Sequence, residues 1–395
     1  MITDLLAYKI ATKGLFIVHH AFHKDGLNLF KEKEIPAVNI PFNKPYLTGW
    51  EQAYINQVLY NGNGTTGNYA TKCLEYFKMV YSVKNCRLTS SYAHASEIAA
   101  KLLDIQDGDE VIIPSFAPFE TVAALIEKGA NLIFADSRKD HPGMDEQQIE
   151  VLVTPKTKAI MVFHYAGIAA DMDIIMDIAD RNNLLVVEDA SQCIDAYYKN
   201  RALGTIGHLG IMSFDDSKNI ICGSAGLLMI NDDHLAERAE QFKKKSGKET
   251  PAHNEMTAAF LYAQLQQLQK IQKSRLDTWN RYYEELKELE VLGFAKMPVV
   301  PEYAIHNAHM FYITLPDHTV QEKLKAYLKQ MGISATNHYT AIHSSDAFSD
   351  SLGGRVLPNC ITYNQCLLRL PLYTGMTIAE QKTVINKIWR FFLQK

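Results

Sequence analysis

Two polar residues that could do chemistry each lie at the end of an apolar run. Asp189 closes the run Val186-Val187-Glu188-Asp189, and Lys218 follows the strand-like segment Gly210–Phe214. A carboxylate beside a buried strand costs free energy unless it is paired. A lysine near another cation can lose its proton and become a nucleophile. A helix cap and a solvated surface lysine are the ordinary alternatives. If both residues face one pocket, Asp189 can pair with a bound cation while Lys218 acts as the nucleophile.

Two further segments could hold a ligand. Ser91, Tyr92 and Ala93 come directly before or at the start of an expected helix at His94. Hydroxyl residues there can cap the helix, or its free N–H groups and positive end can bind a phosphate. The turn 113–119 follows a strand and could place an aromatic ring over a planar ligand. Packing of its two Phe rings in the core is the commoner explanation.

The elements that would position these segments form a regular pattern. From about residue 86 to about residue 232, apolar strands alternate with amphipathic helices. The spacing predicts strands at 111–113, 131–135, 159–163 and 184–187, and helices at 94–104, 121–128, 149–153 and 171–182. This alternation indicates an α/β fold with a mostly parallel sheet covered on both faces. Ligands of such sheets bind beyond the carboxyl ends of the strands, where the candidate segments fall.

We expect three parts along the chain. Residues 1–38 show no sustained period and are interpreted as an extension of unknown role, and residues 39–250 hold the large α/β domain. Residues 251–395 are expected to hold a long connecting helix and a small C-terminal α+β domain. The helical pattern over 258–290 would extend for ~50 Å if unbroken. The small domain is predicted to contain a strand at 310–315 and helices at 320–331 and from 378 onward.

The composition narrows the class of protein. Of 395 residues, 47% are hydrophobic and 21% are charged, as in globular domains. A net charge of −4 offers no field that would hold nucleic acid or an anionic membrane. No apolar run reaches the ~18–20 residues of a membrane span. The six cysteines form no C-x-x-C pair or disulfide framework, and no metal site is expected. We therefore expect a cytoplasmic protein with neither nucleic-acid nor membrane partners.

A phosphate-binding turn, an aspartate, a ring-stacking position and a lysine are the parts that hold pyridoxal 5′-phosphate (PLP). N–H and hydroxyl donors bind the phosphate, and the aldehyde needs a lysine amine. The aspartate keeps the pyridine nitrogen protonated, so that the ring can take up electrons. At ~3 Å and an effective dielectric near 20, that ion pair is worth roughly 5 kcal/mol before desolvation.

From about residue 40 to the C-terminus, the chain resembles the DegT/DnrJ/EryC1/StrS sugar aminotransferases at several stretches that follow one another in the same order as in that family. The matching stretches are 103–111, 164–167 with 171–173, 187–190, 201–208, 213–219 and 307–312. The resemblance implies a PLP-dependent transferase fold of the aspartate-aminotransferase type (type I) and a homodimer with its active sites at the interface. By the same resemblance, Lys218 is the Schiff-base lysine, Asp189 pairs with the pyridine nitrogen and Gln192 lies near the ring hydroxyl. The phosphate is then held by four further residues, Ser213, Ser91, Tyr92 and Ala93.

The activity implied by the resemblance is transfer of an amino group from glutamate to a dTDP-4-keto-6-deoxyhexose, in surface-polysaccharide synthesis. Lys218 would carry the proton between the amino-acid carbon and the cofactor. His338 and Tyr339 could contact the sugar nucleotide, while a hydrogen-bonded core or interface histidine is the alternative. Sequence leaves the choice of sugar open, because it rests on a few pocket contacts.

Some positions depart from the family pattern. Pro118 replaces an aromatic residue, Ser224-Ala225 replaces a Glu-Gly pair, and Tyr92 replaces a threonine. The stretch 246–253 is shortened and lacks the usual Asn and Arg. These departures favour an alternative, a weakly active or non-catalytic relative that keeps the fold and serves as a binding or scaffold protein. The retained Lys218 and Asp189 favour the enzyme.

Overall fold

The computed structural model describes residues 39–60, 68–246 and 254–393. Residues 39–395 form one compact unit. The predicted extension at 1–38 and the shortened stretch at 247–253 lie outside the described residues. The division into a large and a small domain near residue 250 stays a prediction. No helix in the described ranges is both long enough and apolar enough to cross a membrane.

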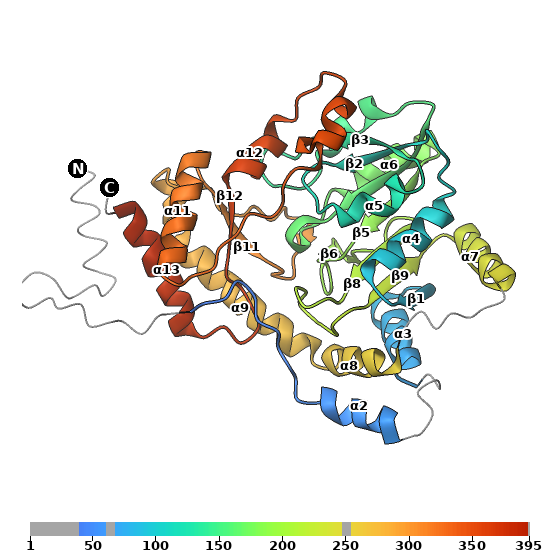
Figure 1. Cartoon of the computed structure of the whole chain (residues 1–395), viewed down its shortest axis with the longest axis horizontal. Coiled ribbons are helices and arrows are strands. Elements are labelled where there is room, and N and C mark those ends of the chain that lie inside the picture. The colour runs from blue at the N-terminus through green and yellow to red at the C-terminus, as the bar shows by residue number, and fades with distance from the viewer. Residues whose placement is uncertain (1–38, 61–67, 247–253, 394–395) are drawn as a thin grey trace, which may run out of the picture. The chain divides into compact units, whose positions relative to one another are not determined.

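The centre of the unit is a seven-stranded sheet in the order β1-β9-β8-β5-β4-β2-β3 (Figure 1). The strands are β1 (Asn85–Thr89), β2 (Glu110–Pro114), β3 (Asn131–Ala135), β4 (Thr157–Phe163), β5 (Leu185–Asp189), β8 (Leu209–Ser213) and β9 (Gly226–Ile230). Only β9 runs against its neighbours, β1 and β8, while the other pairs are parallel. Every residue of β8 and β9 is buried, as expected for strands covered on both faces. The prediction of a mostly parallel α/β sheet is confirmed.

The apolar periodicity predicted helices that correspond to α4 (Tyr92–Leu103), α5 (Glu120–Ile126) and α6 (Met172–Asn182). Helices α3 (Asn68–Tyr81) and α7 (Asp233–Ser246) also pack on the sheet and were not predicted. Helix α6 shows the local logic. Asp171 caps its first turn through Ile174 N, and Asn183 ends it in the left-handed conformation. The short helix expected at 149–153 is replaced by two 3₁₀ turns, η1 (Glu146–Gln148) and η2 (Glu150–Leu152).

The helical pattern over 258–290 is not one helix, so the expectation of a ~50 Å rod is wrong. It is divided into α8 (Glu255–Leu265), α9 (Leu268–Leu286) and α10 (Glu288–Val291), and Gln267 between the first two has non-helical dihedrals (φ −110°, ψ 11°). Helix α8 packs on α3 and on α2 (Glu51–Tyr60), whereas α9 packs on α13 (Ile378–Leu393). The direction of each helix is thus set by the elements on which it packs. No Gly or Pro marks the break, which arises from tertiary packing.

The remaining elements lie around α9 and the sheet (Figure 1). Strands β11 (Phe311–Thr314) and β12 (Leu367–Leu370) form an antiparallel pair. Helices α11 (His318–Gln330) and α12 (Pro358–Cys366) are connected by the 3₁₀ turns η4 (Ile342–Ser344) and η5 (Asp346–Leu352), and η3 (Tyr165–Gly167) follows β4. A three-stranded sheet has the order β10 (Ala304–Ile305), β6 (Tyr197–Tyr198), β7 (Arg201–Ala202). The predicted strand at 310–315 and the helices at 320–331 and from 378 are confirmed.

Candidate active site

The sheet register gathers the predicted site residues at one edge. Asp189 is the last residue of β5, and its register partner on β8 is Ile211, two residues before Ser213. On the far side of β8, Ser213 faces Gly226, which in turn faces Thr89 at the end of β1. The turn at 90–93 therefore lies beside Ser213. This is the edge at which the α/β topology predicted a ligand site.

Asp189 is fully buried and receives three hydrogen bonds. Its Oδ2 accepts from the Tyr92 hydroxyl and from Thr121 Oγ1, both at 2.6 Å, and its Oδ1 accepts from Ser191 N at 3.0 Å. Within the part of the chain that the structure describes, no Lys, Arg or His forms an ion pair with it. A buried carboxylate with donors but no cation is suited to a positively charged ligand group. Thr121 and the hydroxyl of Tyr92 were not predicted as its partners.

Lys218 is largely buried, with a side chain that is 12% exposed, and it lies 3.5 Å from Asp215 Oδ2. Asp215 also accepts from Ser213 Oγ at 2.8 Å and from Ser217. Burial pushes the pKa of Asp215 upward, but Lys218 and these donors outweigh it, so its pKa lies below the usual value. The Ser213 hydroxyl, predicted to donate to a phosphate, therefore donates to Asp215 in this structure. Asp215 was not singled out from the sequence.

Asp189 and Lys218 act on a common neighbour, the buried thiol of Cys193. Burial raises the pKa of this thiol well above its ordinary value, Asp189 and Glu188 raise it further, and Lys218 lowers it. The hydrogen bonds point the same way, because Asn219, which follows Lys218, donates to Asn307 O at 2.9 Å, and Asn307 Nδ2 donates at 2.8 Å to the carbonyl of Gln192, three residues after Asp189. The acid at the end of β5 and the turn that carries the amine therefore lie in one region.

The turn before α4 keeps main-chain donors free. Ser91 caps the helix by accepting from His94 N at 3.1 Å. The N–H groups of Tyr92 and Ala93 donate to no acceptor among the described residues. The turn is also held by the segment that leads into β9, because Ser224 Oγ donates to Ser90 O at 3.0 Å. The predicted phosphate site therefore has two of its expected N–H donors available.

Gly226 fixes how closely β9 approaches this turn. A Cβ at Gly226 would lie 2.5 Å from Ser91 O and 2.6 Å from Thr89 Oγ1. No side chain fits there unless the turn moves. The glycine therefore sets the position of the main chain that would face a phosphate.

Gln192 and Tyr339, two residues of the predicted site, contact each other, and His338 packs on Tyr339; the roles assigned to them stay predictions. Gln192 Nε2 donates to the Tyr339 hydroxyl at 2.8 Å, and its Oε1 accepts from Ala166 N at 2.7 Å. The rings of His338 and Tyr339 stack at 4.9 Å. Burial, and secondly the charge of Arg369, lowers the pKa of His338 to about 4, so its Nδ1 accepts from Arg369 Nη1 at 2.6 Å.

Arg369 is a site residue that the sequence reasoning missed. It is 5% exposed, its guanidinium lies 4.4 Å from the centre of the Phe42 ring, and its Nε has no hydrogen-bond partner. Burial lowers its pKa. In the described ranges it has no carboxylate partner, which leaves a buried cation able to receive an anionic group.

A buried polar network lies directly behind Lys218. Asn219 Nδ2 donates to Gln272 Oε1 and to Asn307 O, both at 2.9 Å, and its Oδ1 pairs with His309 Nδ1 at 2.9 Å. Asn307 in turn donates to Gln192 O and Ile194 O. The network connects the lysine turn with α9 and with the loop after β5. The stretch 307–312 carried a sequence resemblance, but no role was assigned to it.

In the described part of the chain, neither Phe ring of the turn at 113–119 lies beside Asp189, whose side-chain partners are Tyr92, Thr121 and Ser191 N. Phe116 is buried against Tyr165 (5.4 Å), whereas Phe119 is 55% exposed at the start of α5. Core packing of both Phe rings, the commoner explanation, is therefore right for Phe116 and wrong for Phe119.

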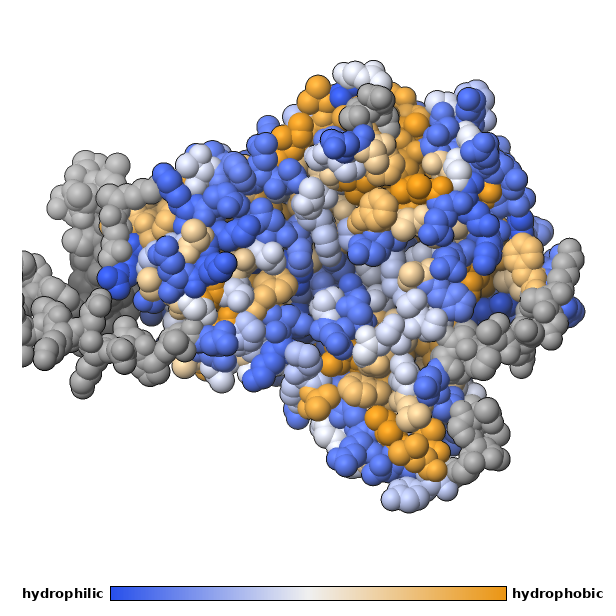
Figure 2. All heavy atoms as spheres, viewed as in Figure 1, coloured by the Kyte–Doolittle hydropathy of each residue, from blue (hydrophilic) through white to orange (hydrophobic). Residues whose placement is uncertain are grey.

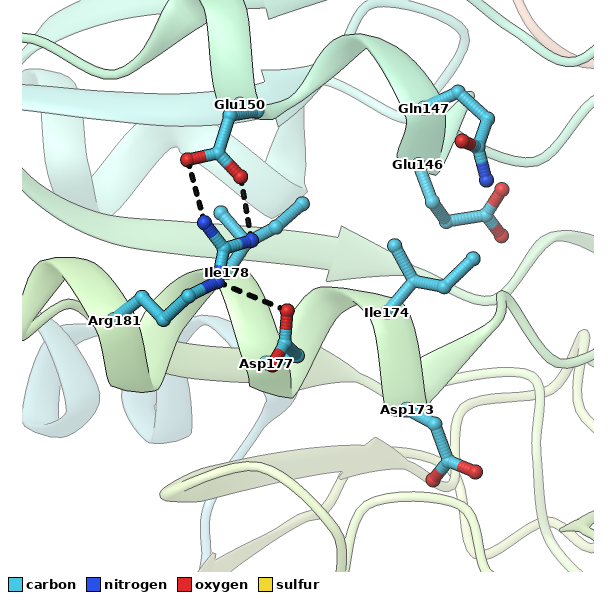
Figure 3. A pocket seen from close by; sticks show the side chains of 8 residues that line it. All are labelled: Glu146, Gln147, Glu150, Asp173, Ile174, Asp177, Ile178 and Arg181. Carbon is cyan, nitrogen blue, oxygen red and sulfur yellow. Dashed lines mark hydrogen bonds and ion pairs between the residues drawn. The ribbon is translucent and has the colours of Figure 1, made fainter.

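A groove of about 410 Å³ on η1, η2 and α6 contains none of the predicted site residues. Its lining includes Glu146, Glu150, Asp173, Asp177 and Arg181 (Figure 3). Arg181 bonds to Glu150 and Asp177, while Glu146 pairs with Arg138 and Asp173 pairs with Lys199 and Arg201, so each of the four carboxylates already has a basic partner. No set of three or more His, Cys, Asp or Glu side chains in the described ranges is arranged to hold a metal ion.

The residues at the sheet edge fit PLP. Asp189 offers a buried negative charge without a cation, Lys218 offers an amine in the same region, and the turn at 90–93 offers free N–H groups. When bound, PLP supplies an electrophilic aldehyde and a ring that takes up electrons. These are the chemical groups that an acid, an amine and an anion-binding turn would hold.

Comparison with known proteins agrees with this arrangement. The model of the DegT/DnrJ/EryC1/StrS aminotransferase family matches residues 45–389. The chain has 26% identity to DesV of S. venezuelae, with a TM-score of 0.80 over 89% of this chain and 98% of that one. It has 25% identity to a DegT DnrJ EryC1 StrS aminotransferase from Brucella abortus (TM-score 0.78, 87% and 95% covered). The aminotransferase TlmJ from Streptoalloteichus hindustanus shares the fold, with 23% identity and a TM-score of 0.83 over 90% and 100%.

Proposed function

This chain belongs to the DegT/DnrJ/EryC1/StrS aminotransferase family, and we propose that it transfers the amino group of glutamate to a dTDP-4-keto-6-deoxyhexose. It is a PLP-dependent sugar aminotransferase. The proposed product is dTDP-4-amino-4,6-dideoxygalactose, made for surface-polysaccharide synthesis. The observation that carries the proposal is that Asp189, at the end of β5, and the turn of Lys218, which follows the neighbouring strand β8, are linked at one sheet edge through Asn219, Asn307 and the carbonyl of Gln192.

The residues of the site have distinct proposed tasks. Asp189 holds the protonated ring nitrogen, and its burial strengthens that pairing because the local dielectric is low. Lys218 anchors the cofactor through its amine and then carries the proton between the substrate carbon and the cofactor carbon. Gln192 lies beside the ring hydroxyl. The phosphate is held by Ser213 and by the turn that contains Ser91, Tyr92 and Ala93, mainly through the main-chain N–H groups of that turn.

Asp215 has a proposed part in the proton transfer. It lies 3.5 Å from the Lys218 amine and its pKa is below the usual value, so it is ionised at neutral pH. Its negative charge stabilises the ammonium that Lys218 becomes when it accepts a proton. The same charge would repel a phosphate, and the single hydroxyl proton of Ser213, which is donated to Asp215 in this structure, would have to turn to the phosphate when the cofactor binds.

The glutamate donor requires a partner for its carboxylate. Arg369 is buried, has no carboxylate partner in the described ranges, and has an unpaired Nε. It is linked to the site by contacts, because its Nη1 bonds to His338 Nδ1 at 2.6 Å, His338 stacks on Tyr339, and the Tyr339 hydroxyl accepts from Gln192 at 2.8 Å. We therefore assign Arg369 to the donor carboxylate, and His338 and Tyr339 to the sugar nucleotide.

We further propose a homodimer whose active sites lie at the interface. Large hydrophobic side chains are exposed on α2 and just before it, namely Leu47 (62%), Trp50 (52%), Leu59 (58%) and Tyr60 (87%). Figure 2 shows hydrophobic residues gathered over α2 and the adjacent α8. Exposed apolar patches of this kind are typical of subunit contacts.

The test combines cofactor binding with product analysis. Purified protein with PLP should show an absorbance change that Lys218→Ala lacks. With glutamate and dTDP-4-keto-6-deoxyglucose it should release 2-oxoglutarate and an aminosugar nucleotide, whose configuration NMR would identify. Turnover of UDP-linked or 3-ketosugars in place of this substrate would overturn the sugar assignment. Absence of any PLP-dependent absorbance change would overturn the site.

A second candidate is a non-catalytic relative that binds the cofactor and acts as a scaffold. The exposed Phe119 and the absence of an aromatic residue at position 118 favour it. It predicts bound PLP without any reaction with glutamate. A single-turnover experiment with the PLP-loaded protein separates the two candidates.

A further inference from the structure

Tyr92 connects the two ends of the predicted cofactor site. Its main chain belongs to the turn whose N–H groups face the phosphate position, and its hydroxyl donates to Asp189 Oδ2 at 2.6 Å. The side chain thus spans from the phosphate end to the carboxylate that is assigned to the ring nitrogen. No role in the reaction proposed above requires this hydrogen bond.

The acceptor capacity of Asp189 is nearly used up by the protein itself. A carboxylate offers about four lone-pair positions, two on each oxygen. On Asp189, Tyr92 and Thr121 take both positions on Oδ2, and Ser191 N takes one on Oδ1. Each donor withdraws negative charge from the carboxylate, so each weakens its attraction for a further N–H group. One position remains for a ligand.

Of these three donors, Tyr92 is the one that can leave. Ser191 N belongs to the main chain beside β5, and Thr121 is 1% exposed within α5. Tyr92 is partly exposed at the first turn of α4. Burial, followed by the charge of Asp189, raises the pKa of Tyr92 well above its ordinary value, so its hydroxyl remains a donor at all working pH values.

We propose that Tyr92 sets the affinity for the cofactor, because its hydroxyl and the protonated ring nitrogen compete for Asp189. This inference rests on the proposed role of Asp189. The hydroxyl satisfies the buried carboxylate when no cofactor is bound. Cofactor binding then replaces or weakens a hydrogen bond that already exists, and the cofactor is held less tightly than it would be without the hydroxyl.

The experiment measures the dissociation constant of pyridoxamine 5′-phosphate, which forms no covalent bond with Lys218, by calorimetric titration of the cofactor-free protein. Tyr92→Phe removes the hydroxyl and keeps the ring, and it should bind about tenfold more tightly, the value of one hydrogen bond to a charged group. Tyr92→Thr should also bind more tightly. Tyr197→Phe is the matched control, since it removes a similar bond from Tyr197 to Asp195 Oδ1 (2.9 Å), and it should leave the affinity unchanged.

A cofactor analogue with carbon in place of the ring nitrogen identifies the cause. It cannot donate to Asp189, so Tyr92→Phe should bring no gain in its affinity. Equal or weaker binding of pyridoxamine 5′-phosphate by Tyr92→Phe would overturn the proposal, and so would an equal gain with the analogue. If wild type, Tyr92→Phe and Tyr92→Thr all fail to bind the cofactor, the site assignment itself is wrong. Binding by all three with equal affinity refutes only the role of Tyr92.

Discussion

Asn219 is expected to hold the lysine turn in place, and Asn219→Ala tests this directly. Its side chain makes three hydrogen bonds, to Gln272, Asn307 and His309, each at 2.9 Å. Burial lowers the pKa of His309 well below its usual value, so the ring is neutral and its Nδ1–H donates to the Asn219 oxygen. The substitution removes all three hydrogen bonds at the residue that directly follows Lys218.

The size of the effect follows from the groups that lose their partner. The Asn307 carbonyl keeps a second donor, Gln272 Nε2 at 3.4 Å. The Gln272 oxygen and the His309 Nδ1–H lose theirs, at about 1–3 kcal/mol for each buried group. We expect the free energy of unfolding to fall by about 2–6 kcal/mol. With an unfolding entropy of about 2.1 cal/mol/K per residue and roughly 350 residues, this lowers Tm by about 3–8 °C.

The assay is thermal and urea unfolding of the cofactor-free protein, combined with borohydride trapping of PLP on Lys218. Asn219→Ala should lower Tm and slow the trapping, because the turn that carries the amine is less constrained. The control Asn182→Ala removes one bond, to Ile178 O at the end of α6, and should lower Tm by about 1 °C or less. A Tm shift for Asn219→Ala as small as that of the control, or trapping at the wild-type rate, would refute the reasoning.

Three further predictions follow from other residues. Burial lowers the pKa of His141 to about 4, below the ~6.5 of an unfolded chain, so the unfolded state binds a proton first and stability falls as the pH drops from 6.5 towards 4. In urea unfolding at a series of pH values, His141→Asn should remove about 2 kcal/mol of that loss at pH 5, and an unchanged dependence of stability on pH would contradict this prediction. Arg369→Gln should raise the KM for glutamate about tenfold or more, because it removes the proposed partner of the donor carboxylate. It should have much less effect on the half-reaction of the PLP-loaded protein with the aminosugar nucleotide, which has no amino-acid carboxylate, and equal effects on both substrates would place Arg369 elsewhere in the mechanism. Trp50→Glu should shift the protein from dimer to monomer in analytical ultracentrifugation, whereas the control Lys84→Glu, at an exposed surface position, should not. If the Trp50→Glu variant remains a dimer, the interface does not lie on α2.

The sequence predicted the sheet and the place of the site because both depend on local patterns. Apolar runs such as 159–163 can hardly be anything but buried strands, and they lie within β4. Their carboxyl ends must meet at one edge of a parallel sheet. Asp189 and Lys218 were therefore recognisable from their positions after two such runs.

The contacts that complete the site could not be predicted in the same way. Gln272 and Arg369 lie far along the chain from Lys218. Only the packing of α9 brings Gln272 to Asn219, and only the packing of β12 brings Arg369 to His338. The break between α8 and α9 likewise has no local signal, since it reflects the different neighbours of the two helices. Periodicity identifies which face of an element is buried, but it does not identify the residues that the face meets.

At the positions that depart from the family pattern, the main chain of the site keeps its arrangement. Ser224 donates to Ser90 O, so this substituted segment, directly before β9, still holds the phosphate turn. Gly226 retains the close approach that only a residue without Cβ permits. Tyr92, the bulkier residue, adds a donor to Asp189. The substitutions therefore alter how strongly the cofactor's groups are held, not where they would be held, and that difference can be measured as affinity independently of turnover.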